Sequence, residues 1–208
     1  MDTSRLITVE GTEGAGKSSA LAIIRDWVTA HGGEPVVTRE PGGTALGEEL
    51  REVLLGHREA GMSAEAEVLL MFAARAEHVR TVIQPALQAG QWVICDRFTD
   101  ASLAYQGGGR GLGIARVRAL ADWLLGDLQP GLTLWLDLPV ATGLARAAGR
   151  SAPDRFESER ARFFEAVRAA YAELANADPT RIARVDATQS LARVGAAIET
   201  LLDEHYDD

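Results

Sequence analysis

The sequence has very little lysine, very little cysteine and too few positive charges to balance its negative ones. Its one cysteine, Cys95, cannot form a disulfide within the chain, which fits a reducing compartment. The net charge of −9 at pH 7 argues against a protein that binds long nucleic acid through its overall field. No apolar run approaches the roughly 20 residues of a membrane-spanning helix. We therefore expect a cytoplasmic protein, with neither a membrane nor a nucleic-acid polymer as its partner.

The length of the chain is sufficient for a core without disulfides or a structural metal. Of its 208 residues, 47% are hydrophobic and 25% are charged, which is ordinary for a globular protein. The first residues lead into an apolar run without a basic and apolar leader, which argues against secretion. No internal repeat or low-complexity linker is present. The sequence predicts a single domain over residues 1–208.

The only lysine, Lys17, lies in a phosphate-binding motif, whereas twenty arginines are spread over the chain. Residues 11–18 read GTEGAGKS and match the P-loop pattern GxxxxGK[ST]. A compact ammonium reaches between the β- and γ-phosphates of a nucleotide, which a planar guanidinium does poorly. The glycines let successive N–H groups point at phosphate oxygens, and Ser18 is placed to ligate Mg²⁺. The predicted ATP-binding residues of the loop are Gly11, Thr12, Glu13, Gly14, Ala15, Gly16, Lys17, Ser18 and Ser19.

Five short apolar runs alternate with helical segments along the chain. Such runs, buried on both faces and separated by helices, are typical of a doubly wound α/β fold. The predicted strands are 6–10, 35–38, 92–95, 132–136 and 182–185. The predicted helices are 18–30, 46–55, 64–89, 113–126, 139–149, 156–177 and 190–204, of which 64–89 is expected to be broken or bent at Pro85. We expect a five-stranded parallel sheet flanked by helices.

Polar segments follow every predicted strand. Ligands of open parallel sheets bind beyond the carboxyl ends of the strands, so these segments should meet in one cleft. The segments are the P-loop, 39–44, 96–97, Asp137 and 186–188. The last of these is the expected adenine side of the cleft.

Three arginines are expected to join Lys17 in this cleft. Arg39 and Arg97 lie directly after predicted strands, and Arg51 lies on the helix after Arg39. Four positive charges are more than one ATP·Mg²⁺ needs. The pattern therefore favours two phosphorylated ligands, an ATP donor and an acceptor monophosphate that the arginines hold.

Four segments carry a resemblance that covers most of the chain. They read REPGGT at 39–44, DR at 96–97, AYQGGGRG at 104–111 and DRFE at 154–157. In order and spacing, over about 6–202, the chain resembles the bacterial thymidylate kinases, which have the P-loop nucleoside monophosphate kinase fold. The resemblance implies transfer of the γ-phosphoryl group of ATP to dTMP, giving dTDP, with Mg²⁺ as cofactor and a homodimer as the assembly.

The resemblance also implies roles for residues of the cleft. Glu13 is similar to the acidic residue that approaches the 3′-hydroxyl of the acceptor sugar, and it would act in catalysis beside Lys17 and Arg97. The acceptor phosphate would be clamped by Arg39, Arg51 and Arg97. The other residues implied in binding the acceptor are Pro41, Ser102, Tyr105 and Gln106, of which Tyr105 would exclude a ribose 2′-hydroxyl.

The long predicted helix supplies the contacts expected with the thymine base. Arg75 is placed to donate to a thymine carbonyl, and Phe72 to stack on the ring. Many family members place the phenylalanine four residues before the arginine, where this chain has Met71. Both offsets lie on one helical face, so we expect Phe72 to stack, with a position in the core as the alternative.

Residues 146–157 are polar and rich in turn-forming residues, which favours a lid over the ATP site. The P-loop position that carries an arginine in one group of the family is Gly14 here, so the chain resembles the lid-arginine type. An arginine of the lid would neutralise charge on the transferred phosphoryl group. Arg150 is the first candidate for this catalytic role and Arg146 the second, and both are expected to contact ATP.

Asp96, at the end of a predicted strand, is a candidate Mg²⁺ ligand beside Ser18. A general base is not needed, because the acceptor phosphate is already anionic near neutral pH. The four histidines show no metal-ligand spacing and are interpreted as surface or packing residues. Two alternatives stay open: a kinase for another nucleotide or nucleoside, and a P-loop switch protein, although the guanine-reading NKxD motif is absent from the sequence.

Overall fold

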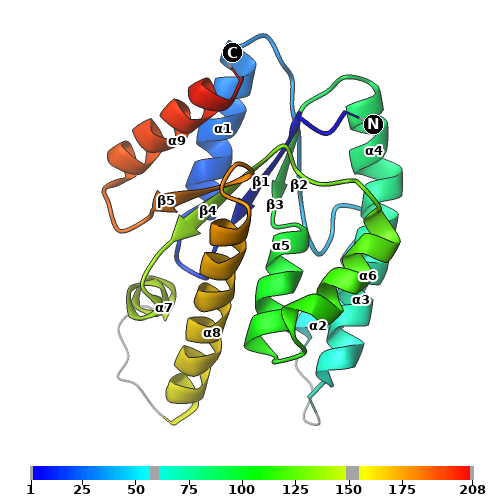
Figure 1. The fold of residues 1–208 in the computed structure, drawn as a ribbon, viewed down its shortest axis with the longest axis vertical. Coiled ribbons are helices and arrows are strands. Elements are labelled where there is room, and N and C mark those ends of the chain that lie inside the picture. The colour runs from blue at the N-terminus through cyan, green and yellow to red at the C-terminus, as the bar shows by residue number, and fades with distance from the viewer. Residues whose placement is uncertain (1, 57–60, 149–154, 207–208) are drawn as a thin grey trace.

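A computed structural model describes residues 2–56, 61–148 and 155–206. Five strands form one sheet in the order β2-β3-β1-β4-β5, and every neighbouring pair is parallel (Figure 1). The strands are β1 (Leu6–Glu10), β2 (Val36–Arg39), β3 (Val93–Asp96), β4 (Leu132–Asp137) and β5 (Ile182–Asp186). The predicted five-stranded parallel sheet is confirmed.

Helices connect the strands and cover the sheet. They are α1 (Lys17–Ala30), α2 (Ala45–Leu55), α3 (Ala64–His78), η1 (Val79–Ile83), α4 (Gln84–Gln88), α5 (Thr99–Ser102), η2 (Leu103–Gly109), α6 (Ile114–Leu125), α7 (Val140–Ala148), α8 (Arg155–Ala177) and α9 (Leu191–Tyr206). Two of them, η1 and η2, are π-helical. None of the helices in the described part of the chain combines the length and apolar character needed to cross a bilayer.

The helix predicted over 64–89 is a succession of α3, η1 and α4. Pro85 lies in the first turn of α4 and has no N–H to donate to the carbonyl four residues before it. The π-helical turn at η1 directly precedes this position and accommodates the missing bond. Where a break or bend was predicted at Pro85, the structure has contiguous helical elements with a π-helical turn before the proline.

The helical segment 99–109, made of α5 and η2, was not predicted. Three successive glycines, Gly107, Gly108 and Gly109, disfavour a helix by propensity. A Cβ at Gly108 would clash with Ala170 of α8, and one at Gly109 would clash with Phe163. Close packing against α8 therefore requires glycine here and overrides the local preference.

Residues that alternate along β1 and β4 divide the core between the two faces of the sheet. Ile7, Val9 and Leu134 pack with α1 and α9 on one face. On the other face Trp135 packs with side chains of α3, α6 and α8. Figure 1 shows α1 beside α9 on one side of the sheet, and α3, α6 and α8 on the other.

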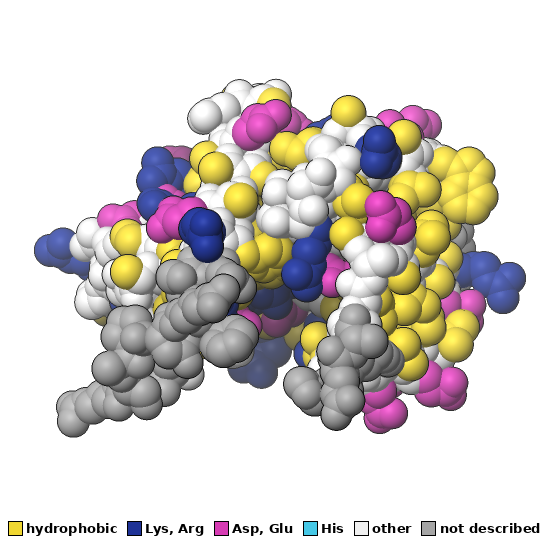
Figure 2. Space-filling model, turned by 90° about the horizontal axis from the view of Figure 1, so that it is seen from below, with side chains coloured by type: hydrophobic (Ala, Val, Ile, Leu, Met, Phe, Trp, Pro, Cys, Tyr) yellow, Lys and Arg dark blue, Asp and Glu magenta, His cyan; other side chains and the backbone are white. Residues whose placement is uncertain are grey.

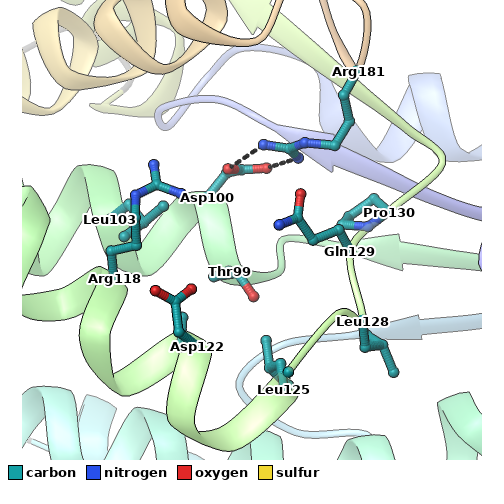
Figure 3. A pocket seen from close by; sticks show the side chains of 12 residues that line it. Thr99, Asp100, Leu103, Arg118, Asp122, Leu125, Leu128, Gln129, Pro130 and Arg181 are labelled. Carbon is teal, nitrogen blue, oxygen red and sulfur yellow. Dashed lines mark hydrogen bonds and ion pairs between the residues drawn. The ribbon is translucent and has the colours of Figure 1, made fainter.

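A small cavity lies between α5, α6 and the loop before β4 (Figure 3). Arg181, which lies just before β5, pairs with the buried carboxylate of Asp100 at 2.6 Å on its border. The cavity measures about 30 Å³, which is room for about two water molecules. Thr99 Oγ1, on the same border, is buried without a hydrogen-bond partner among the described residues. A cavity of this size suits ordered water and is far too small for a nucleotide.

Candidate active site

The P-loop joins β1 to α1, and its backbone requires glycine. Gly14 and Gly16 have φ angles of 74° and 92°, in the left-handed region that other residues rarely adopt. A Cβ at Gly14 would also clash with the carbonyl oxygen of Gly143 in α7. This backbone therefore leaves no space for an arginine at position 14 of the loop.

Lys17 lies at the start of α1 and folds back over the loop. Its Nζ donates to the carbonyl oxygens of Gly11 at 3.3 Å and Thr12 at 3.2 Å. Burial lowers the pKa of the Lys17 ammonium to about 8, and the nearby guanidinium of Arg97 adds to this effect. A bound phosphate would add negative charge beside the ammonium and favour its charged form.

A cavity of about 740 Å³ opens beside the P-loop, within the size range of small-molecule sites. Figure 2 shows a hollow in this face of the molecule, with Lys and Arg side chains in and around it. The residues that line the cavity include Glu13, Gly14, Gly16, Lys17, Ser18, Ser19, Glu40, Pro41, Arg51, Glu67, Met71, Asp96, Arg97, Ala101, Tyr105, Gln106 and Arg110. Residues from α1, α2, α3, η2 and the loops after β1, β2 and β3 thus meet around one space.

Two of the three predicted clamp arginines face this cavity. Arg97 donates from Nη2 to Gly11 O at 3.3 Å and to the Tyr105 hydroxyl at 3.2 Å, and its guanidinium lies 5.4 Å from the centre of the Tyr105 ring. Arg51 donates from Nη1 to Pro41 O at 2.8 Å. Together with Lys17, these residues place three cations around the cavity.

The third predicted clamp residue, Arg39, does not line the cavity. Its Nη2 donates to both carboxylate oxygens of Glu48, at 2.9 and 2.8 Å, and it borders a neighbouring hollow instead. Successive side chains of a strand point to opposite faces, and Glu48 in the first turn of α2 provides a carboxylate on the Arg39 side. The structure therefore corrects the expected position of Arg39.

Arg75 is buried, with 1% of its surface exposed, and its guanidinium is held on two sides. Nε donates to Glu40 Oε2 at 2.7 Å, and Nη2 donates to Phe98 O and Ser102 Oγ, each at 3.0 Å. Nη1 has no hydrogen-bond partner among the described residues. Ser102 is itself fully buried, contacts Arg75 and is not among the residues that line the cavity.

Gln106 lines the cavity, and only one of the two polar atoms of its side-chain amide has a hydrogen-bond partner among the described residues. Its Nε2 donates to Glu67 Oε1 at 2.8 Å, whereas Oε1 is buried without a partner in the described part of the chain. The cavity wall therefore holds one buried acceptor, on Gln106, that a ligand can satisfy. The buried donor on Arg75 is not itself part of the wall, but Arg75 is joined to it through Glu40, which lines the cavity. Buried polar groups are rarely left without a partner, and those that are ask for an explanation.

The structure places Met71, not Phe72, on the wall of the cavity. Phe72 is 6% exposed and belongs to the hydrophobic cluster shared by α3, α6 and α8. Its ring lies beneath the guanidinium of Arg75, 4.7 Å from centre to Cζ. One residue along a helix rotates a side chain by about 100°, so the shifted phenylalanine points into the core. The position of Phe72 thus matches the alternative of a core residue, in a cation–π contact with Arg75, and Met71 takes the place on the cavity wall.

Two arginines outside the P-loop contact it. Arg160 of α8 donates to Glu13 Oε2 at 2.5 Å. Arg146 of α7 donates to Gly14 O at 3.4 Å and to Ala187 O at 3.1 Å, and so links the loop to the segment after β5. The first candidate for the catalytic lid arginine, Arg150, lies outside the described residues, as do residues 149–154 of the expected lid.

Oxygen ligands for a magnesium ion are present in the cavity. Ser18 and Asp96 both line it, and Asp96 Oδ1 is buried without a partner among the described residues. Mg²⁺ in nucleotide sites takes one or two protein oxygens and completes its shell with phosphate and water. These two residues fit such an ion in number and in chemistry.

Glu10, at the carboxyl end of β1, fixes the turn that carries Arg97. Its carboxylate accepts from Phe98 N at 2.8 Å, from Ala101 N at 3.3 Å and from the Tyr171 hydroxyl at 2.6 Å. Burial raises the pKa of the Glu10 carboxyl to about 7, and the neighbouring Asp100 adds to this effect. The hydrogen bonds to the charged form compensate part of the cost of burying it.

Some expectations for the loops were wrong and some residues were missed. Asp137, expected in the cleft, is buried in ion pairs with Arg168 and Arg184. Four residues that shape the site were given no role: Glu40, Glu67, Arg110 and Arg160. Glu40 could have been found, because it lies inside the motif at 39–44. Glu67 and Arg160 lie in helices, and the sequence does not indicate which distant residue a charged side chain of a helix will pair with.

The family model and the relatives found by comparison with known proteins all indicate the same family. The family model described as Thymidylate kinase matches residues 9–198. The chain is 60% identical to the thymidylate kinase of Alkalilimnicola ehrlichii over 203 residues, which is 97% of this chain and 94% of the relative. It is 54% identical to that of Pseudomonas syringae pv. tomato, covering 97% and 96% of the two chains. It is 51% identical to that of Teredinibacter turnerae, covering 97% and 98%.

Proposed function

The chain belongs to the thymidylate kinase family, whose reaction is the phosphorylation of dTMP to dTDP, and from this premise we propose how its cavity performs the reaction. ATP·Mg²⁺ is the donor, and its phosphates bind the P-loop, with Lys17 between the β- and γ-phosphates. The phosphate of dTMP binds Arg51 and Arg97. The observation that carries the proposal is one cavity that joins the loop, the cations Lys17, Arg51 and Arg97, and an unsatisfied buried acceptor on Gln106.

The unsatisfied groups match the edge of thymine. Thymine presents a carbonyl acceptor at position 4 beside an N–H donor at position 3. Arg75 Nη1 is a donor without a partner and Gln106 Oε1 an acceptor without one, among the described residues. A site built to hydrogen-bond its substrate rejects analogues that leave its buried groups unpaired. Met71 packs on the base, and Tyr105 excludes a 2′-hydroxyl.

Charge stabilisation, rather than a general base, drives the transfer. The γ-phosphoryl group passes to an acceptor oxygen that is already anionic, so positioning and neutralisation of charge suffice. Ser18 and Asp96 would hold Mg²⁺, and the ion would supply a further positive charge to the phosphates. Glu13, which lines the cavity, approaches the 3′-hydroxyl of the acceptor sugar.

We expect Arg150→Ala to lower kcat about 10²-fold and to leave the affinity for dTMP nearly unchanged, because a lid arginine acts on the transferred group. Steady-state kinetics and dTMP titrations measure the two quantities. Arg146→Ala is the comparison, since Arg146 already contacts two backbone carbonyls. Turnover of Arg150→Ala within about threefold of the wild type would refute the assignment to Arg150.

A homodimer is proposed through α2, α3 and α6. Large hydrophobic residues on these helices are exposed, among them Leu69 at 57% and Trp123 at 83%. Ala115 and Ala119 precede Trp123 at helical spacing on α6, and all three are exposed, so a second helix can approach closely. An exposed tryptophan on an apolar face is typical of an interface anchor.

We expect Trp123→Glu to weaken dimerisation at least about tenfold, because it replaces the most exposed large hydrophobic side chain of these helices with a charge. Sedimentation velocity over a concentration series measures the effect. Leu191→Glu is the matched control, because Leu191 is 64% exposed on α9, on the other face of the sheet. An equal loss in both variants, or a monomeric wild type, would contradict the interface.

The proposed function is tested by coupled ADP release with ATP·Mg²⁺ and each nucleoside monophosphate in turn. We expect fast turnover with dTMP and slower turnover with dUMP, which lacks the methyl group. Turnover with thymidine would mean that the arginines do not clamp a phosphate, and ADP release without any acceptor would favour a P-loop switch protein. The protein is proposed to work in the cytoplasm, where its buried Cys95 stays reduced.

A further inference from the structure

Glu40 connects Arg75 to a second buried residue, His78 of α3. Its Oε2 accepts from Arg75 Nε at 2.7 Å, and its Oε1 lies 2.9 Å from His78 Nδ1. Glu40 is 4% exposed and His78 is fully buried. One carboxylate therefore bridges the expected base-reading arginine and a histidine that the reaction does not use.

The chain of contacts continues to the edge strand of the sheet. A carboxylate beside an always-charged guanidinium is an acceptor, so His78 Nδ1 carries the proton that it donates to Glu40. His78 Nε2 lies 2.7 Å from the hydroxyl of Thr38, on β2. The neutral Nδ1–H tautomer satisfies both contacts, because Nε2 then accepts from the hydroxyl. We call Thr38, His78 and Glu40 the Thr38–His78–Glu40 relay.

The relay leaves the guanidinium of Arg75 one orientation. Glu40 holds Nε, and Phe98 O and Ser102 Oγ hold Nη2. The rings of Phe72 and Phe98 lie 4.7 and 5.4 Å from Arg75 Cζ and restrict movement of the plane. Only Nη1 remains without a partner among the described residues. A guanidinium with this many fixed contacts cannot rotate, so the N–H groups of Arg75 Nη1 point in one fixed direction.

We propose that the Thr38–His78–Glu40 relay positions Arg75 and thereby determines which pyrimidine the enzyme accepts. The proposal rests on the proposed function of Arg75 as the donor to the 4-carbonyl of thymine. A cytosine ring presents an amino group at position 4, so a fixed Arg75 would set donor against donor. If the fork is free to rotate, that conflict is relieved and discrimination is lost. Glu40 and His78 are positioning residues, since neither is assigned a contact with the reacting atoms.

The test compares dTMP with 5-methyl-dCMP, which differs from dTMP at position 4 of the ring and in the protonation of N3. We expect the wild type to prefer dTMP, and Glu40→Gln to lower the ratio of the two kcat/KM values at least about tenfold. The loss should appear in KM for dTMP, with kcat at saturating dTMP within about threefold of the wild type. The ratio of dTMP to dUMP reports only on the methyl group and should not change.

Further variants separate positioning from stability. His78→Ala should lower the same ratio, and His78→Asn, which keeps an amide donor toward Glu40, should restore most of it. Glu48→Gln is the matched control, because Glu48 pairs with Arg39 and makes no hydrogen bond or ion pair with Arg75 among the described residues. It should leave the ratio unchanged. Thermal unfolding of each variant shows whether it is folded, and the His78 pair decides the question if Glu40→Gln is not.

The outcomes keep the two proposals apart. A wild type without preference for dTMP over 5-methyl-dCMP would refute base reading by Arg75 itself. A wild type with the preference, together with Glu40→Gln and His78→Ala that keep it within about twofold, would refute the relay alone. Equal losses with both nucleotides would mean that Glu40 serves stability and not selectivity.

Discussion

Lys17→Met is expected to lower kcat about 10³-fold, the largest effect of any single change in the chain. The P-loop ammonium compensates charge on the β- and γ-phosphates as the phosphoryl group moves, and methionine keeps the length of the side chain without the charge. Steady-state phosphorylation of dTMP measures the loss. Lys17→Arg is the informative companion: it restores the charge, but the planar fork does not fit between phosphates, so we expect little recovery. A kcat within about tenfold of the wild type for Lys17→Met would contradict the role.

The same residue gives a pH dependence with a defined sign. Burial beside Arg97 lowers the pKa of the Lys17 ammonium to about 8 in the ligand-free protein. Phosphates favour the charged form, so binding of ATP raises this pKa and takes up a proton when the pH is above about 8. ATP affinity should be constant below that pH and fall as the pH rises through it. Calorimetric titrations in buffers of different ionisation enthalpy measure the proton uptake, which Lys17→Met should abolish.

Arg97→Gly is expected to lower kcat/KM for dTMP by about 10²-fold to 10³-fold without lowering the unfolding temperature. Arg97 holds a φ of 68°, a conformation that costs a residue other than glycine roughly 1–3 kcal/mol. Glycine relieves this strain and removes the guanidinium that clamps the acceptor phosphate. Arg97→Ala keeps the strain and should match the kinetic loss with a lower unfolding temperature.

The two Arg97 variants separate function from stability. Kinetics and thermal unfolding of both, measured under the same conditions, give four numbers. Kinetic losses that agree while the stabilities differ would assign the loss to the missing charge. A recovery of activity in Arg97→Gly relative to Arg97→Ala would mean instead that backbone conformation, and not the guanidinium, limits the reaction.

Short apolar runs made the sheet predictable, because each buried strand of a parallel sheet is apolar on both faces. The place of the cavity followed from the rule that ligands bind at the carboxyl ends of such strands. This reasoning located Lys17, Arg51 and Arg97 together, and all three line the cavity. It could not locate residues whose direction depends on a partner far away in the sequence.

Arg39 and Phe72 show what was beyond prediction. Arg39 pairs with Glu48, nine residues along the chain. The motif that contains Arg39 does not indicate whether its guanidinium binds a carboxylate of the protein or a phosphate of a ligand. Phe72 lies one residue from the position that faces the cavity, and about 100° of rotation decides between base and core. The segment 99–109 is helical because α8 approaches its glycines, which is a tertiary effect.

The chain's single lysine has a chemical consequence outside catalysis. Neutral amines attack the acyl carbon of acylating reagents, whereas guanidinium groups do not react because they stay protonated. Lys17 carries the sole side-chain amine of the protein, and its pKa of about 8 leaves much of it neutral in mildly basic solution. An acylating reagent without phosphate groups would therefore attach covalently at this one side chain, at the base of the phosphate site, and bound ATP, which raises the pKa of Lys17, would protect it. The composition of the protein makes its nucleotide pocket addressable by a reaction that is unselective in most other proteins.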